Sequence, residues 1–186
     1  MRAKSGAGFL IIENMKKVFV WIALAFSIVS FAQTTDDRAY LVKVGDKAPD
    51  FTIKLTDGKT VKLSTLIGKV VMLQFTASWC SVCRKEMPFI EKNIWQKHKS
   101  NPNFALMAVD RDEPLATVKK FTKSIPITYQ IGLDPKANIF ALYAQRKAGI
   151  TRNVIIDKTG KIVFLTRLYD EAEFNQMTKV IDDLLK

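Results

Sequence analysis

The chain has 186 residues, of which 48% are hydrophobic, and its formal net charge is +11. This length suits a single domain of ordinary size. The basic residues are spread over the expected helices and turns, and no basic run alternates with aromatic residues. The charge therefore favours a solvated basic surface over a nucleic-acid site, and the presence of only two cysteines excludes a disulfide framework.

Residues 1–32 have the pattern of a leader that contains a secretory signal peptide. Two lysines follow Met15, the expected start of the signal, and a run of apolar or small residues covers 18–32. Small residues at the end of this run predict cleavage between Ala32 and Gln33. A membrane span needs about 20 apolar residues, so the run is short for one, and an uncleaved inner-membrane anchor is the alternative.

Cleavage at this point would leave a mature chain with two parts. Residues 33–42 begin with polar side chains and are expected to form a flexible N-terminus, while residues 43–186 are expected to fold as one domain. We expect the mature protein to be extracytoplasmic, in the periplasm, and monomeric. It would touch the membrane only through an uncleaved leader.

Strand and helix patterns alternate along residues 43–186. Alternating or apolar runs predict strands at 51–55, 59–63, 70–75, 104–109, 127–131, 153–157 and 161–165. Helices are predicted at 80–99, 113–123 and 136–145, followed by a last helix whose apolar face ends at Leu184. The first two and the last two strands should form hairpins. This order predicts an α/β fold with a mixed central sheet, right-handed crossovers and helices on its faces.

The two cysteines, Cys80 and Cys83, lie where an apolar strand gives way to a helix. Cys80 falls at the helix N-terminus, where unpaired N–H groups and the helix dipole favour a thiolate over a thiol. A thiolate attacks disulfides, and a second thiol three residues further on can resolve the mixed disulfide. Pro88, inside the same helix, removes one hydrogen bond and should kink it.

A zinc site or a purely structural disulfide are the alternatives for this cysteine pair. Zinc needs four ligands, whereas the chain offers two cysteines and the distant His98, which we expect to be solvated. A bridge between such near neighbours removes little chain entropy. We therefore expect a redox-active disulfide that uses no metal and no other cofactor.

Four segments resemble those of a known family: VGDKAPDF at 44–51, ASWC at 77–80, CRKEMP at 83–88 and IIDKTGK at 155–161. Together they are similar to the thioredoxin superfamily, and most closely to its extracytoplasmic TlpA/ResA-like thiol-disulfide oxidoreductases. The resemblance covers about residues 43–186. It implies a thioredoxin-like three-layer fold with an extra N-terminal β-hairpin.

The resemblance also implies roles for residues around the cysteines. Cys80 would attack and Cys83 would resolve, while Trp79 would cover the disulfide and contact partners. Glu86 matches an acidic residue that could act as acid or base for Cys83. The other reading of Glu86 is an exposed charge in the first helical turn, and the residues alone leave both open.

The chain departs from the family pattern at three places. Ser81 and Val82 separate the cysteines, with no histidine between them, which weakens an oxidase reading. Gln74 replaces a buried aspartate and cannot take up a proton. Thr151 stands where relatives carry a cis proline, so we expect it to lie against the cysteine pair. Since a cis bond before a residue other than proline costs about 2.5–4 kcal/mol, the Ile150–Thr151 bond should be trans.

These observations predict a disulfide reductase of extracytoplasmic proteins, with protein disulfides or thiols as clients and an upstream electron donor. A peroxiredoxin-type thiol peroxidase is one alternative, but it would need a threonine where Ala77 stands. A non-enzymatic thioredoxin-like adaptor or copper metallochaperone is another. Copper chaperones of this fold would want a longer cysteine spacing and a histidine after His98, which the chain lacks.

Overall fold

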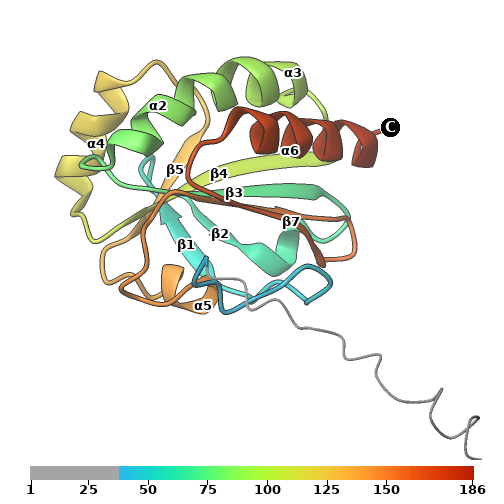
Figure 1. The fold of residues 1–186 in the computed structure, drawn as a ribbon. Coiled ribbons are helices and arrows are strands. Elements are labelled where there is room, and N and C mark those ends of the chain that lie inside the picture. The colour runs from blue at the N-terminus through green and yellow to red at the C-terminus, as the bar shows by residue number, and fades with distance from the viewer. Residues whose placement is uncertain (1–37) are drawn as a thin grey trace, which may run out of the picture. The chain divides into compact units, whose positions relative to one another are not determined.

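The computed structural model describes residues 38–186, and a seven-stranded sheet lies at the centre of this part (Figure 1). The strands are β1 (Thr52–Leu55), β2 (Thr60–Lys62), β3 (Val70–Thr76), β4 (Phe104–Arg111), β5 (Gln130–Asp134), β6 (Arg152–Ile156) and β7 (Ile162–Arg167). Their order is β2-β1-β5-β4-β3-β6-β7. β3, β4 and β5 run parallel, whereas the hairpins β1–β2 and β6–β7 are antiparallel and form the two edges. The mixed sheet with its extra N-terminal hairpin confirms the predicted fold class.

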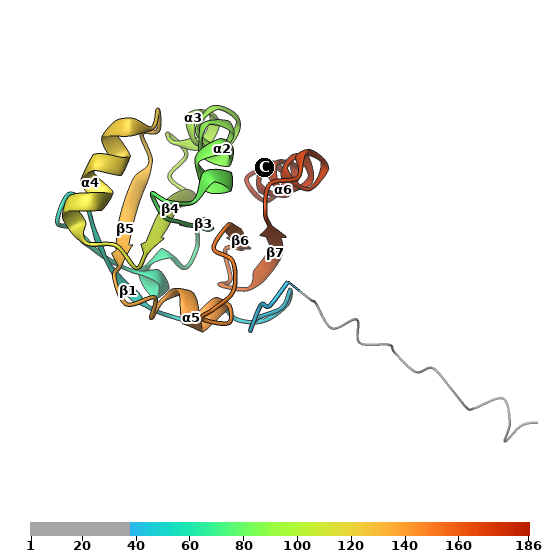
Figure 2. The same ribbon diagram turned by 60° about the vertical axis from the view of Figure 1, so that its left-hand side comes forward.

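Helices cover both faces of this sheet. They are η1 (Leu63–Leu66), α2 (Ser81–Ile90), η2 (Glu91–Trp95), α3 (Gln96–His98), α4 (Leu115–Ser124), α5 (Phe140–Tyr143) and α6 (Glu171–Leu184). Met87 and Ile90 of α2 share one core cluster with buried residues of α4 and α6, and those of η1 and α5 share the other. Figures 1 and 2 show α2 and α6 on one side of the sheet and α5 on the opposite side. The domain therefore has three layers.

β3 is the strand that leads into the cysteine pair, and all seven of its residues are buried. Leu73 and Phe75 belong to the core cluster on the α5 side, while Val70 and Met72 belong to the cluster on the α2 side. A strand that is buried on both faces has a continuous apolar sequence. For this reason the sequence of β3 shows no polar alternation.

The helix predicted at 80–99 is present but changes its hydrogen bonding along the way. α2 is α-helical, η2 is a turn of π-helix, and α3 is α-helical again. Pro88 lies inside α2 and has no N–H to donate. The π-helical turn begins three residues later, so the expected disturbance appears as a change of helical pattern.

The helix predicted at 136–145 is wrong except for the single turn α5. The Asp134 carboxylate accepts the backbone N–H groups of Asn138 and Phe140, at 2.7 and 2.9 Å. These bonds hold the residues before α5 in a turn instead of a helix, because short polar side chains compete with the helical hydrogen-bond pattern.

The expectation that His98 is solvated is also wrong. Its side chain is only 12% exposed, and its Nε2 lies 2.7 Å from Oδ1 of Asp182 on α6. The His98 ring also packs edge-on against Phe104, with the ring centroids 5.5 Å apart. His98 therefore links α3 to α6 and to the start of β4.

The first described residues are held against the domain. The Tyr40 hydroxyl donates to the carbonyl of Thr166 at 2.6 Å, and its ring lies 4.3 Å from the guanidinium carbon of Arg152. Residues 38–42 thus differ from the flexible segment that the sequence predicts. The predicted leader at 1–32 lies outside the described residues. Within the part that the structure describes, no helix is both long and apolar enough to cross a membrane.

Candidate active site

Cys80 and Cys83 form a disulfide at the start of α2. Cys80 is the N-cap of this helix, and its Sγ accepts the backbone N–H of Cys83 at 3.1 Å. Cys80 is 7% exposed and Cys83 is completely buried. Cys80 is therefore the one residue of the pair with any exposed surface. After reduction, the helix start and the Cys83 N–H would stabilise a negative charge on that sulfur.

Thr151 lies against the cysteine pair, as the sequence predicts. Its Oγ1 is 3.3 Å from the sulfur of Cys80 and 3.3 Å from that of Cys83. The described chain contains no cis peptide bond, so the Ile150–Thr151 bond is trans, also as predicted. A hydroxyl can donate one hydrogen bond. Thr151 thus places a donor beside whichever sulfur carries negative charge.

Exposed apolar side chains flank the disulfide. Trp79 directly precedes Cys80 and is 59% exposed. Leu168, at the end of β7, is 47% exposed, and its N–H donates to the carbonyl of Thr151 at 3.1 Å. Trp79 is the chain neighbour of Cys80, and Leu168 is hydrogen-bonded to Thr151, whose hydroxyl lies beside both sulfurs. Trp79 thus presents an exposed apolar side chain directly before Cys80.

Glu86 is buried, with 2% exposure, which rules out the reading as an exposed helix charge. It lies one turn after Cys83 on α2, where its Oε1 accepts a hydrogen bond from the Asn153 amide at 2.7 Å. Burial raises the pKa of Glu86 to about 7, although the hydrogen bond from Asn153 opposes this rise. Gln74 in turn accepts a hydrogen bond from the Tyr129 hydroxyl at 2.8 Å. A carboxyl group that titrates near neutrality thus lies close to the cysteine pair.

Sequence reasoning missed a pair of buried acidic residues, Asp110 and Glu113, next to the turn that carries Cys80. Both carboxylate oxygens of Glu113 accept hydrogen bonds from Ser78, and the neighbouring Asp110 is fully buried. A signal was present in the sequence. The acidic run at 110–113 follows a parallel strand next to β3, and such strand ends meet at one edge of a sheet.

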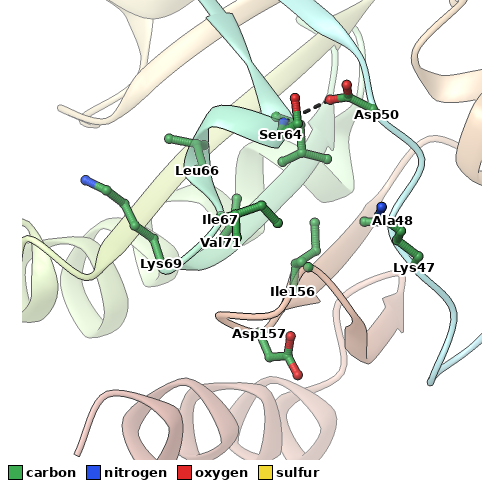
Figure 3. A pocket seen from close by; sticks show the side chains of 12 residues that line it. Lys47, Ala48, Asp50, Ser64, Leu66, Ile67, Lys69, Val71, Ile156 and Asp157 are labelled. Atoms are coloured by element: carbon green, nitrogen blue, oxygen red, sulfur yellow. Dashed lines mark hydrogen bonds between the residues drawn. The ribbon is translucent and has the colours of Figure 1, made fainter.

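A separate apolar cavity of about 140 Å³ lies at the other end of the sheet. Figure 3 shows Ile67, Val71 and Ile156 around it. Val71 lies near the start of β3, whereas the disulfide follows the end of that strand. The cavity is thus remote from the sulfurs. Among residues 38–186, no group of three or more metal-ligating side chains could hold a metal ion.

Comparisons with known proteins point to one family. The family model described as Redoxin matches residues 43–181. The chain is 32% identical over 122 residues to the thiol-disulfide oxidoreductase ResA of Bacillus cereus, which covers 66% of this chain and 68% of the relative.

Two solved structures agree with this match. One is the solution structure of a putative protein disulfide isomerase from Bacteroides thetaiotaomicron, with 66% identity, a TM-score of 0.77, and coverage of 79% of this chain and 92% of the other. The second is the crystal structure of a putative thiol:disulfide interchange protein DsbE from Chlorobium tepidum. It shows 31% identity, a TM-score of 0.69, and coverage of 78% and 99%.

Proposed function

The chain belongs to the Redoxin family of the thioredoxin superfamily and is a thiol-disulfide oxidoreductase, and we propose that it works as a reductase of protein disulfides outside the cytoplasm. The observation that carries this proposal is the unequal exposure of the two cysteine residues at the start of α2. Cys80 can be reached from solvent, and Cys83 is fully buried one turn inside.

The reaction begins when the Cys80 thiolate attacks one sulfur of a client disulfide. A Cys80–client bond forms, the client disulfide breaks, and the second client sulfur leaves and takes up a proton. Cys83 then attacks the Cys80 sulfur and releases the first client sulfur as a thiol. The client gains two electrons, the enzyme is left with the Cys80–Cys83 disulfide, and an upstream dithiol donor returns the two electrons.

We assign Glu86 as the group that accepts the proton of Cys83 and returns it. A thiol must lose its proton before it can attack, and a carboxyl whose pKa is about 7 can both accept and return a proton near neutral pH. Its position one turn after Cys83 on the same helix supports this role. Gln74 has no acidic proton and cannot take this role, so Glu86 is the carboxyl group that remains for it.

The reduction potential tests the proposed direction. With no histidine between Cys80 and Cys83, the charge on Cys80 is stabilised mainly by the helix start and the Thr151 hydroxyl. We expect a value nearer thioredoxin's, about −270 mV, than that of the oxidant DsbA, about −120 mV. A glutathione redox titration of residues 33–186 would measure it. A value above roughly −150 mV on the same scale would contradict the reductase assignment.

Thr151 is expected to raise this potential by donating a hydrogen bond to the reduced Cys80. A hydrogen bond to a charged group contributes about 1.5–3 kcal/mol, and about 30 mV corresponds to 1.4 kcal/mol in a two-electron couple. Thr151→Val should therefore shift the potential by about 30–60 mV to more negative values, and Thr151→Pro should shift it in the same direction. Thr151→Ser keeps the hydroxyl and serves as the control. Unchanged potentials in the Val and Pro variants would make residue 151 a neutral replacement.

The proposed partners rest on the thiol-disulfide chemistry, and the proposed location rests on the pattern of the leader. We propose protein disulfides and thiols as clients, a separate upstream donor, and a monomeric enzyme. The pattern of the leader at 1–32 supports export to the periplasm or, if the leader is retained, an inner-membrane anchor. N-terminal sequencing of the protein recovered from cells would decide between the two, since cleavage predicts a new N-terminus at Gln33.

A further inference from the structure

Two acidic side chains are buried beside the turn that carries Cys80. Asp110, on β4, is paired in register with Thr76 of β3 and has no exposed surface. Glu113 lies just before α4 and is 7% exposed. Its Oε2 accepts the backbone N–H of Ser78 and its Oε1 accepts the Ser78 hydroxyl, each at 2.6 Å. The disulfide reaction described above uses none of these groups.

The two carboxyl groups differ in the hydrogen bonds that they accept. Glu113 accepts two short hydrogen bonds from Ser78, which an ionised carboxylate does best. Among the described residues, no N–H or hydroxyl donor reaches either oxygen of Asp110. Burial, the negative charge of Glu113 and a hydrogen bond with Glu113 raise the pKa of Asp110 to about 8. Near neutral pH, Asp110 therefore keeps its proton.

The surrounding charged groups do not neutralise this pair. Asp112 adds negative charge and forms an ion pair with Arg111 at 2.7 Å. On β5, the Asp134 carboxylate accepts two N–H groups of its own turn. On α2, the Arg84 guanidinium packs over the ring of Phe121, 5.3 Å from its centroid. Because Asp110 keeps its proton, the pair does not carry two adjacent negative charges.

We propose that Asp110 and Glu113 share one proton and act as positioning residues for the turn that carries Cys80. This inference rests on the proposed function of the disulfide. While Asp110 is protonated, Glu113 holds Ser78, two residues before Cys80 and next to the exposed Trp79. When Asp110 loses its proton, the two like charges repel, the hold on Ser78 weakens, and Cys80 reacts more slowly with protein disulfides.

An NMR titration of the oxidised protein tests the shared proton, because neither cysteine titrates in the disulfide. The Ser78 amide shift should show a step near pH 8, where Asp110 loses its proton. Asp110→Asn keeps the side-chain shape but removes the titration, so its Ser78 step should vanish. Glu86→Gln changes the other buried carboxyl with a raised pKa and should keep the step. An identical step in wild type and Asp110→Asn would overturn the proposal.

The rate at which the reduced enzyme cleaves a model protein disulfide, the scrambled disulfides of ribonuclease, tests the positioning. Ser78→Ala and Glu113→Gln should each slow this reaction roughly tenfold at neutral pH, below the about 100-fold that a misplacement of 1 Å can cost. We would measure the rates of the wild type and of Asp110→Asn at each pH. The ratio of the wild-type rate to the variant rate should fall as the pH rises through the Ser78 titration step. Wild-type rates in both Ser78→Ala and Glu113→Gln would refute the positioning role. A wild type that cleaves no protein disulfide would instead refute the proposed function, and the Ser78 titration would still decide the shared proton.

Discussion

A Cys83→Ser variant is expected to accumulate mixed disulfides with client proteins through Cys80. Cys80 caps the start of α2 and is the one residue of the pair with exposed surface, so we expect it to make the first bond. Without the buried Cys83 thiol, nothing releases the client, and turnover should be lost. Non-reducing gels of the variant, expressed in the periplasm and quenched with acid, would show the adducts as bands that dithiothreitol removes.

The matched variant is Cys80→Ser, which should form no such adducts, because its remaining thiol is completely buried. Labelling of the reduced wild type with a limited amount of iodoacetamide gives an independent check. Most of the label should be found on Cys80. If Cys83 reacted faster, or if Cys80→Ser trapped clients, the two roles would be reversed.

The elements that the sequence predicts well are those whose pattern has a single cause. The apolar run of β3 needs burial on both faces, and β3 is the fully buried strand of a three-layer fold. The spacing of Cys80 and Cys83 after such a strand needs one sulfur at the helix start and one a turn inside. Thr151 could also be placed in advance, because the family resemblance puts it in the slot where relatives carry a cis proline against the cysteine pair.

What the sequence does not reveal depends on contacts between distant segments. Glu86 has the same local sequence whether it is exposed or buried, and its burial depends on Asn153, 67 residues away. His98 is similar, because its partner Asp182 lies on the last helix. The helix predicted at 136–145 failed for a local reason, because the Asp134 carboxylate accepts the N–H groups of Asn138 and Phe140, a competition that helix periodicity does not include. Periodicity indicates which face of an element is apolar, but not which polar group meets it.

Glu86→Gln is expected to change the pH dependence of the stability of the protein. The pKa of Glu86 is about 7 in the folded protein, against an ordinary value of 4.5. The folded state therefore binds this proton more tightly than the unfolded state. The resulting stabilisation is complete below about pH 4.5 and is lost as the pH rises through about 7.

The size of this loss follows from the shift in pKa. Each pKa unit corresponds to about 1.4 kcal/mol, so the free energy of unfolding of the wild type should fall by up to about 3 kcal/mol across this window because of Glu86. Glutamine carries no titrating proton and can still accept the Asn153 hydrogen bond through its carbonyl. The variant should therefore gain stability relative to the wild type as the pH rises, even though Asp110 adds a fall of the same sign to both proteins.

Urea unfolding of the oxidised proteins at about pH 5 and about pH 8 measures this difference directly. Glu171→Gln makes the same chemical change at an exposed position and should leave the pH dependence as it is. The wild type and Glu86→Gln should lie close together at the lower pH and separate at the higher one, with the variant more stable. Parallel curves for these two proteins would show that Glu86 has an ordinary pKa, and the assignment of Glu86 as the proton acceptor of Cys83 would lose its physical basis.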